Sequence, residues 1–127
     1  MTRVLLVGAG GFVGSILRYA LSGLVQGAAR DSLFPWGTLV VNLTGCLVIG
    51  SLAQLAEARG AFTAETRLLL FTGLLGGFTT FSAFGNETLN LLRDAERTLA
   101  AANVLAHLVL GLACVHLGRV AAHLVWR

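Results

Sequence analysis

Residues 73–84, GLLGGFTTFSAF, decide how this chain folds. They lie in an apolar segment from Leu68 to Leu92 whose one charged residue is Glu87. A helix needs about 20 apolar residues to cross a bilayer, so this segment is long enough to span one. Paired glycines followed by two threonines weaken a helix locally, because glycine loses the most backbone entropy and threonine is stiff at χ1. The sequence therefore predicts a spanning helix that is broken near mid-membrane, and a simple kink is the alternative.

Three further segments have the length and apolar character of membrane spans. The four predicted spans cover about residues 4–25, 36–56, 68–92 and 99–120. Of the 127 residues, 56% are hydrophobic and 12% are charged, whereas about 25% are charged in an average soluble domain. We therefore expect an all-α integral membrane protein with one four-helix transmembrane domain over residues 1–127, and we exclude a water-soluble fold.

The basic residues bear on partners and on orientation. All nine are arginines and they form no basic run, so nothing favours nucleic-acid binding. Arg18 lies within a span and is not counted. With four spans, five of the other arginines fall on the side of the termini (Arg3, Arg59, Arg67, Arg119, Arg127) and three on the other (Arg30, Arg93, Arg97). Orientation normally follows a clear excess of basic residues on the cytoplasmic side. So weak a bias predicts insertion in both orientations, which lets two copies associate antiparallel.

The glycines of the first span permit two interpretations. Residues 4–14, VLLVGAGGFVG, look like a strand entering a dinucleotide-binding turn. That fold needs further βα units, whereas the segments that follow here are helical spans, so this interpretation is rejected. Gly10 and Gly14, like Gly73 and Gly77 in the third span, have the spacing that lets helix backbones approach closely in lipid.

Aromatic and hydroxyl side chains follow the expected break. Phe81 and Phe84 share a helix face because they are three residues apart. Such a pair is usually core, but the edge of an aromatic ring is electropositive and can approach a small anion without a formal charge. Thr80 and Ser82 add hydroxyl donors beside the rings.

Polar residues within the other spans are candidate pathway residues. Asn42 shares a face with Thr38 and Gly45 in the second span, and a mid-membrane amide is costly unless it is hydrogen-bonded or wet. An interhelical hydrogen bond is the alternative for Asn42, and Asn103 in the fourth span is similar. Arg18 is an intramembrane charge that can face a wet vestibule, with Glu87 as one possible partner.

No catalytic constellation is found in the sequence, so we do not expect an enzyme. The three histidines do not form a ligand cluster. Cys46 and Cys114 lie in apolar stretches and are interpreted as small packing residues.

Three motifs together resemble those of the CrcB/Fluc fluoride channels in order, spacing and total length. They are residues 10–19 (GGFVGSILRY), 37–45 (GTLVVNLTG) and 76–84 (GGFTTFSAF). The resemblance implies an antiparallel homodimer in the cell inner membrane, with two fluoride pores and a structural sodium ion at its centre. Such a channel exports fluoride passively from the cytoplasm and so reduces its toxicity.

The resemblance also implies roles for single residues. Phe81 and Phe84 match the phenylalanines that line the pores, Asn42 matches the asparagine that faces them, and Arg18 matches a vestibule arginine. Gly76 and Thr79 match positions whose backbone carbonyls hold sodium. We count Thr80, Ser82 and Asn103 among the fluoride-lining residues.

This chain departs from the family pattern at several positions. Ala83 stands where threonine is common and Ser15 where alanine is common. Asn103 and His107 stand at positions often held by tyrosine and serine.

Two other functions remain possible from the sequence. A small four-span proton-coupled exporter of drugs or cations needs a carboxylate near mid-membrane, for which Glu87 is the one candidate. A helical subunit that transports nothing itself is the other.

Overall fold

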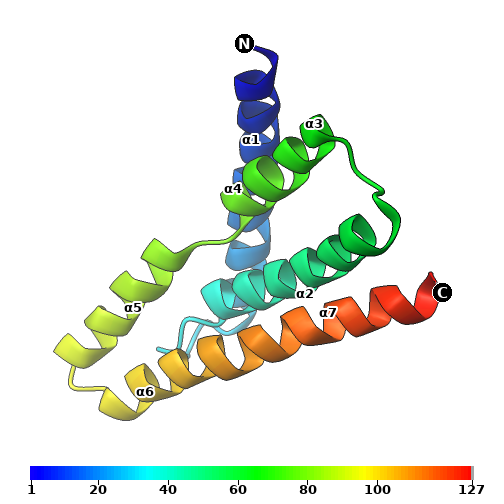
Figure 1. Ribbon diagram of the computed structural model, residues 1–127. Coiled ribbons are helices and arrows are strands. Elements are labelled where there is room, and N and C mark those ends of the chain that lie inside the picture. The colour runs from blue at the N-terminus through cyan, green and yellow to red at the C-terminus, as the bar shows by residue number, and fades with distance from the viewer. Residues whose placement is uncertain (127) are drawn as a thin grey trace.

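The computed structural model describes residues 1–126 and consists of helices joined by short connections (Figure 1). The helices are α1 (Thr2–Ala28), α2 (Trp36–Arg59), α3 (Ala64–Arg67), the π-helical segment η1 (Leu68–Leu75), α4 (Gly76–Phe78), α5 (Phe81–Arg93), α6 (Arg97–Leu105), the π-helical segment η2 (Ala106–Leu110) and α7 (Gly111–Val125). Arg127, the last residue of the predicted domain and of the arginine count, lies outside the described residues.

Four continuous or bent helical stretches are long and apolar enough to cross a membrane. They are Thr2–Ala28, Trp36–Ala58, Ala64–Arg93 and Arg97–Val125. Each contains its predicted span and extends it by a few residues at one or both ends, so the prediction of four spans is confirmed.

The third span is broken, as predicted, and its two halves have different neighbours. The first half, η1 with α4, packs against α1, whereas the second half, α5, packs against α6. In Figure 1 an extended link separates the two halves, and α5 and α6 form a hairpin. Because of the break, one span packs against α1 with its first half and against α6 with its second half.

Glycines lie where the first and third spans touch, because the two helix backbones approach each other closely there. A side chain at Gly14 would meet the carbonyl oxygen of Leu74 and lie 2.9 Å from the Phe78 nitrogen. A side chain at Gly77 would lie 2.6 Å from the carbonyl oxygen of Gly11. Gly76 and Gly77 are themselves helical, so the break does not fall on the glycine pair. It falls on the two threonines that follow.

The second and fourth spans lie side by side (Figure 1). Gly50 of α2 and Gly118 of α7 allow this contact, because a side chain at either would meet the backbone of the other helix. Ser51 donates to the carbonyl of Gly118 at 3.1 Å, and Arg119 forms an ion pair with Glu57 near the ends of the two helices.

Two helix ends use the left-handed backbone conformation. Gly60 closes α2 with φ 57°. Ala95, with φ 62°, follows α5 in a Schellman motif, in which Glu96 donates to Leu91 and Ala95 donates to Leu92. Glycine is usual at this position, since only glycine adopts the conformation without steric cost.

The single chain exposes much of its surface. Its accessible area is 7949 Å², whereas a compact soluble protein of 13.3 kDa exposes about 6,400 Å². Many large apolar side chains are exposed, among them Phe12, Tyr19 and Phe81. The chain therefore presents apolar surface to lipid, to a partner or to both.

Candidate functional site

The break in the third span consists of two extended residues. Thr79 has φ −83° and ψ 158°, and Thr80 has φ −149° and ψ 114°. Backbone at this depth must find hydrogen-bond partners within the protein. The Asn42 side chain of α2 supplies two of them, because its Nδ2 donates to the Thr80 carbonyl at 3.0 Å and its Oδ1 accepts from the Thr80 N–H at 2.9 Å. The interhelical hydrogen bond considered for Asn42 is thus present, and it is made to the break itself.

The break also takes the helical donors from backbone carbonyls, among them those of Gly76 and Thr79. In a continuous helix the Thr80 N–H would bond the carbonyl of Gly76, and the Ala83 N–H would bond that of Thr79. Here the Thr80 N–H goes to Asn42, and the Ala83 N–H goes to the Thr80 hydroxyl at 3.2 Å, which caps α5. The carbonyls of Gly76 and Thr79 are therefore left without their helical donors. Unwound backbone carbonyls of this kind are the ligands that broken membrane helices offer to sodium.

A groove of about 470 Å³ opens beside the break. The predicted site residues Asn42, Gly76, Thr79, Thr80, Phe81 and Phe84 all line it. The rings of Phe81 and Phe84 contact each other, with centroids 5.4 Å apart and planes tilted by 51°. Phe81 is 83% exposed in the single chain. The structure thus brings the two rings, the Asn42 amide and the freed carbonyls to one place.

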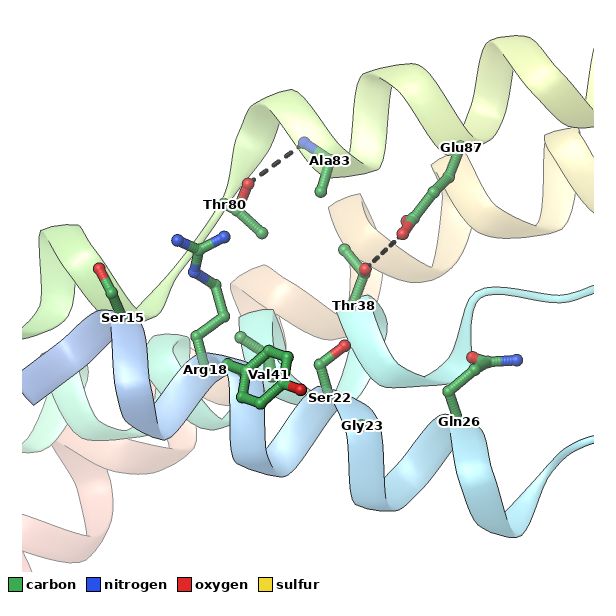
Figure 2. A pocket seen from close by; sticks show the side chains of 11 residues that line it. Ser15, Arg18, Ser22, Gly23, Gln26, Thr38, Val41, Thr80, Ala83 and Glu87 are labelled. Atoms are coloured by element: carbon green, nitrogen blue, oxygen red, sulfur yellow. Dashed lines mark hydrogen bonds between the residues drawn. The ribbon is translucent and has the colours of Figure 1, made fainter.

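Arg18 lies in a second cavity of about 450 Å³, which shares Thr80 with the groove. Its Nε donates to the carbonyl of Gly77 at 3.1 Å. Figure 2 shows the guanidinium reaching from α1 toward Thr80, with Glu87 and Thr38 farther along the cavity. Glu87 accepts a 2.6 Å hydrogen bond from the Thr38 hydroxyl, so the possible pairing of Glu87 with Arg18 is replaced by this contact.

Two predicted site residues are placed differently from the rest. Ser82 is exposed, and its hydroxyl lies 3.3 Å from that of Thr80. Asn103 is completely buried and donates to the Thr88 hydroxyl at 2.9 Å. Asn103 therefore fixes α6 against α5 in the single chain and does not reach the groove.

His107 is a groove residue that sequence reasoning did not include. Its ring contacts that of Phe84, with centroids 4.4 Å apart and planes tilted by 43°. The available signal was its spacing of four residues from Asn103, which places both side chains on the α5 side of the fourth span. The two π-helical segments, η1 and η2, were also not predicted, and both contribute to the groove through Phe71, Leu75 and His107.

Comparison with known proteins assigns the family. The model of the CrcB-like protein family, Camphor Resistance (CrcB), matches residues 5–119. The chain belongs to the CrcB family. Relatives named fluoride-specific ion channel FluC include one from Methylobacillus flagellatus, which is 52% identical over 118 residues, covering 93% of this chain and 92% of the relative. Another, from Opitutus terrae, is 49% identical over 124 residues, covering 96% and 93%.

Membership of the CrcB family decides which class of protein this chain belongs to. Its relatives are named as channels, so the prediction that the chain is not an enzyme is confirmed, and a proton-coupled exporter is not supported. Together with the four spans, the family shows a multi-pass membrane protein.

Proposed function

We propose that this chain is a fluoride-selective channel that lets fluoride leave the cytoplasm passively across the inner membrane. The proposal rests on the relatives, which are named fluoride-specific ion channels and align with more than nine-tenths of this chain. The groove beside the break supports it, because aromatic edges and neutral donors gather there with no fixed positive side chain among its lining residues.

The proposed pathway replaces the hydration of fluoride with weak contacts. The edges of Phe81 and Phe84 offer positive electrostatic potential. The hydroxyls of Thr80 and Ser82 add donors, and Asn42 keeps its second amide hydrogen while the first binds Thr80. Several weak contacts allow an ion both to enter and to leave.

In this proposal Arg18 supplies the positive charge of a vestibule at the pore mouth. Its Nε is held by the Gly77 carbonyl, which fixes the guanidinium and leaves its remaining N–H groups available to the cavity. A fixed positive charge at a pore mouth raises the local concentration of anions. The adjacent carboxyl of Glu87 is held by Thr38.

We further propose an antiparallel homodimer with two pores. The large exposed area of the single chain supports a partner. So does the Phe81 ring, which contacts Phe84 but is otherwise largely exposed, whereas an enclosed pore needs walls on every side. The nearly balanced arginines favour the antiparallel arrangement. The detergent-corrected mass of the purified protein should be twice the 13.3 kDa of one chain, and a mass of one chain would contradict the dimer.

Sodium at the centre of this dimer is the proposed cofactor. The carbonyls of Gly76 and Thr79 are oxygen donors that have lost their helical partners, which fits a hard monovalent cation. Two carbonyls do not complete the coordination of a cation, and a two-fold arrangement doubles their number. The ion would supply a fixed positive field near the pores.

Fluoride efflux from vesicles containing the pure protein tests the function. An ion-selective electrode should record rapid fluoride release and no comparable chloride release. Phe81→Ile should abolish most of the fluoride flux, because it removes the ring edge while keeping an apolar side chain. Phe12→Ile is the matched control, since Phe12 is also an exposed ring but lies on α1 away from the groove. Comparable chloride release would refute selectivity, and unchanged flux in Phe81→Ile would refute the role of that ring.

A further inference from the structure

A pocket of about 460 Å³ lies where the first and third spans begin, and we call it the arginine pocket. A side chain at Gly10 would lie 3.0 Å from the Cα of Gly73, and one turn later a side chain at Gly14 would lie 2.9 Å from the nitrogen of Phe78. The two spans therefore run in the same direction and begin at the same end of the molecule (Figure 1). The pocket is lined by Arg3, Ala64, Arg67, Leu68, Phe71 and Thr72.

The arginine pocket collects positive charge that no carboxylate neutralises. In the part of the chain that the structure describes, neither Arg3 nor Arg67 forms an ion pair, and no acidic residue lines the pocket. Glu65 is close to Arg67 in sequence, but residues two apart on a helix do not face each other. Two positive charges at one cavity repel each other, so an anion bound between them lowers the electrostatic energy.

The Arg67 guanidinium is held in a way that suits a phosphate group. Its Cζ lies over the Phe71 ring, 5.7 Å from the ring centroid. Stacking on a ring uses the face of a guanidinium and leaves the N–H groups at its edge available for bidentate hydrogen bonds to phosphate. The Phe71 ring is itself in edge contact with Phe62, with centroids 6.4 Å apart. The arginine therefore has a supported ring beneath it.

The rest of the lining indicates what the anion is attached to. Leu68 and Phe71 are apolar residues of η1, at the start of a membrane span, and Thr72 adds a hydroxyl donor. A free phosphate would use only the charged side of such a pocket. A phospholipid uses both sides, because its phosphate can bind the arginines while its acyl chains lie against the apolar side chains. Basic pockets between membrane helices bind anionic headgroups in this manner.

We propose that the arginine pocket binds the phosphodiester headgroup of an anionic membrane phospholipid, with Arg3 and Arg67 contacting the phosphate. The site lies apart from the residues proposed to contact fluoride and does not depend on which ion the protein transports. Phe71 lines both the arginine pocket and the groove beside the break. A lipid in the pocket thus lies against a residue that forms part of the groove wall.

Native mass spectrometry of the protein in a neutral detergent tests the proposal. Phosphatidylglycerol should bind saturably, and more tightly than phosphatidylcholine with the same acyl chains. An arginine near a membrane surface contributes about five-fold to the affinity for anionic lipid, so Arg67→Gln and Arg3→Gln should each weaken phosphatidylglycerol binding by about that factor. Arg97→Gln is the matched control, because Arg97 is also an exposed arginine at the start of a span but lies outside the pocket. It should keep the wild-type affinity.

Thermal unfolding distinguishes a lipid from a free anion. Phosphatidylglycerol should raise the unfolding midpoint above that in phosphatidylcholine, because it binds the folded state, whereas inorganic phosphate at the same concentration should not. Arg67→Gln also loses the contact with Phe71, so the midpoints of each variant are compared between the two lipids.

Three results would overturn the proposal. Equal affinity of the wild-type protein for the two lipids would remove the anionic headgroup as the ligand. Equal weakening in Arg67→Gln and Arg97→Gln would mean general attraction to positive charge, without a site. Stabilisation by inorganic phosphate as large as that by phosphatidylglycerol would show that the pocket takes a free anion and not a lipid.

Discussion

At the level of single residues, Asn42 stabilises the break and lines the groove at the same time. One amide satisfies both backbone groups of Thr80 across two helices. Its hydrogen-bond pattern matches that of a neighbouring strand, since it accepts from the N–H and donates to the carbonyl of one residue. The extended conformation at Thr80 therefore depends on a side chain 38 residues earlier.

Replacing Asn42 should destabilise the protein and stop fluoride flux together. Asn42→Leu leaves the N–H and the carbonyl of Thr80 without their partner in a non-aqueous setting, at about 1–3 kcal/mol for each group. We expect a lower midpoint of thermal unfolding in detergent and loss of efflux from vesicles. Thr44→Val is the control, since the Thr44 hydroxyl donates to the Val40 carbonyl of its own helix. An Asn42→Leu protein with the wild-type midpoint would show that the two hydrogen bonds contribute nothing.

At the level of elements, the third span is best understood as two helices with separate partners. Glycine contacts bind its first half to α1, and the α5–α6 hairpin holds its second half. The geometry of the break then depends on how firmly each half is held. Two substitutions examine the two attachments.

The first substitution is Gly14→Ala, which should separate α1 from the first half. The added methyl group would meet the backbone at Leu74, which cannot turn away as a side chain can. Overpacking of this kind costs about 1–3 kcal/mol. We expect a lower unfolding midpoint and reduced fluoride flux, whereas Gly27→Ala in the same helix, with open space around it, should leave both unchanged. Equal behaviour of the two variants would contradict the packing argument.

The second substitution is Ala95→Gly, which should stabilise the α5–α6 hairpin. Ala95 has φ 62°, and the left-handed conformation costs an L-residue about 1–2 kcal/mol. Glycine removes that cost, although part of the gain is lost because glycine makes the unfolded chain more flexible. The unfolding midpoint should rise, with fluoride flux unchanged. A lower midpoint would mean that flexibility of the unfolded chain outweighs strain.

The sequence predicted the spans and six of the residues that line the groove, but not the details of the break. Span length and apolar character depend on composition, and the clustering of Phe81 and Phe84 follows from helical spacing. The position of the break was less accessible. The glycines were expected both to pack closely and to weaken the helix; they pack against α1, and the break falls on Thr79 and Thr80 instead. Asn103 and His107 could not be separated into a buried support and a groove residue, since one helix face includes both.

At the level of the whole molecule, one chain leaves the groove beside the break open. Its area exceeds that of a compact protein of its mass, and Phe81, Gly76 and Thr79 line an open groove. Enclosure by a second copy would complete the walls of the pore and the coordination of the cation. Stability of the assembly is then expected to depend on the salt present.

Removing sodium should therefore destabilise the protein. A ligand that binds only the folded state raises the free energy of unfolding by about 2.7 kcal/mol when its free concentration is 100 times its dissociation constant. We expect a higher unfolding midpoint in sodium chloride than in N-methylglucamine chloride at equal ionic strength, and a smaller mass in detergent without sodium. Thr79→Val should keep this sodium effect, because it leaves the Thr79 carbonyl in place. Identical midpoints in the two salts would count against the cation.

The divided third span also sets an order of assembly during synthesis. Its first half packs on α1, which has already left the ribosome, whereas α5 needs α6, which is made after it. Domains and segments tend to fold from the N-terminus as the chain emerges. The first half can dock at once, held through Gly14 and Gly77, while α5 waits for the fourth span. A nascent chain truncated before Arg97 should thus already hold the first half against α1 but leave α5 without its partner helix.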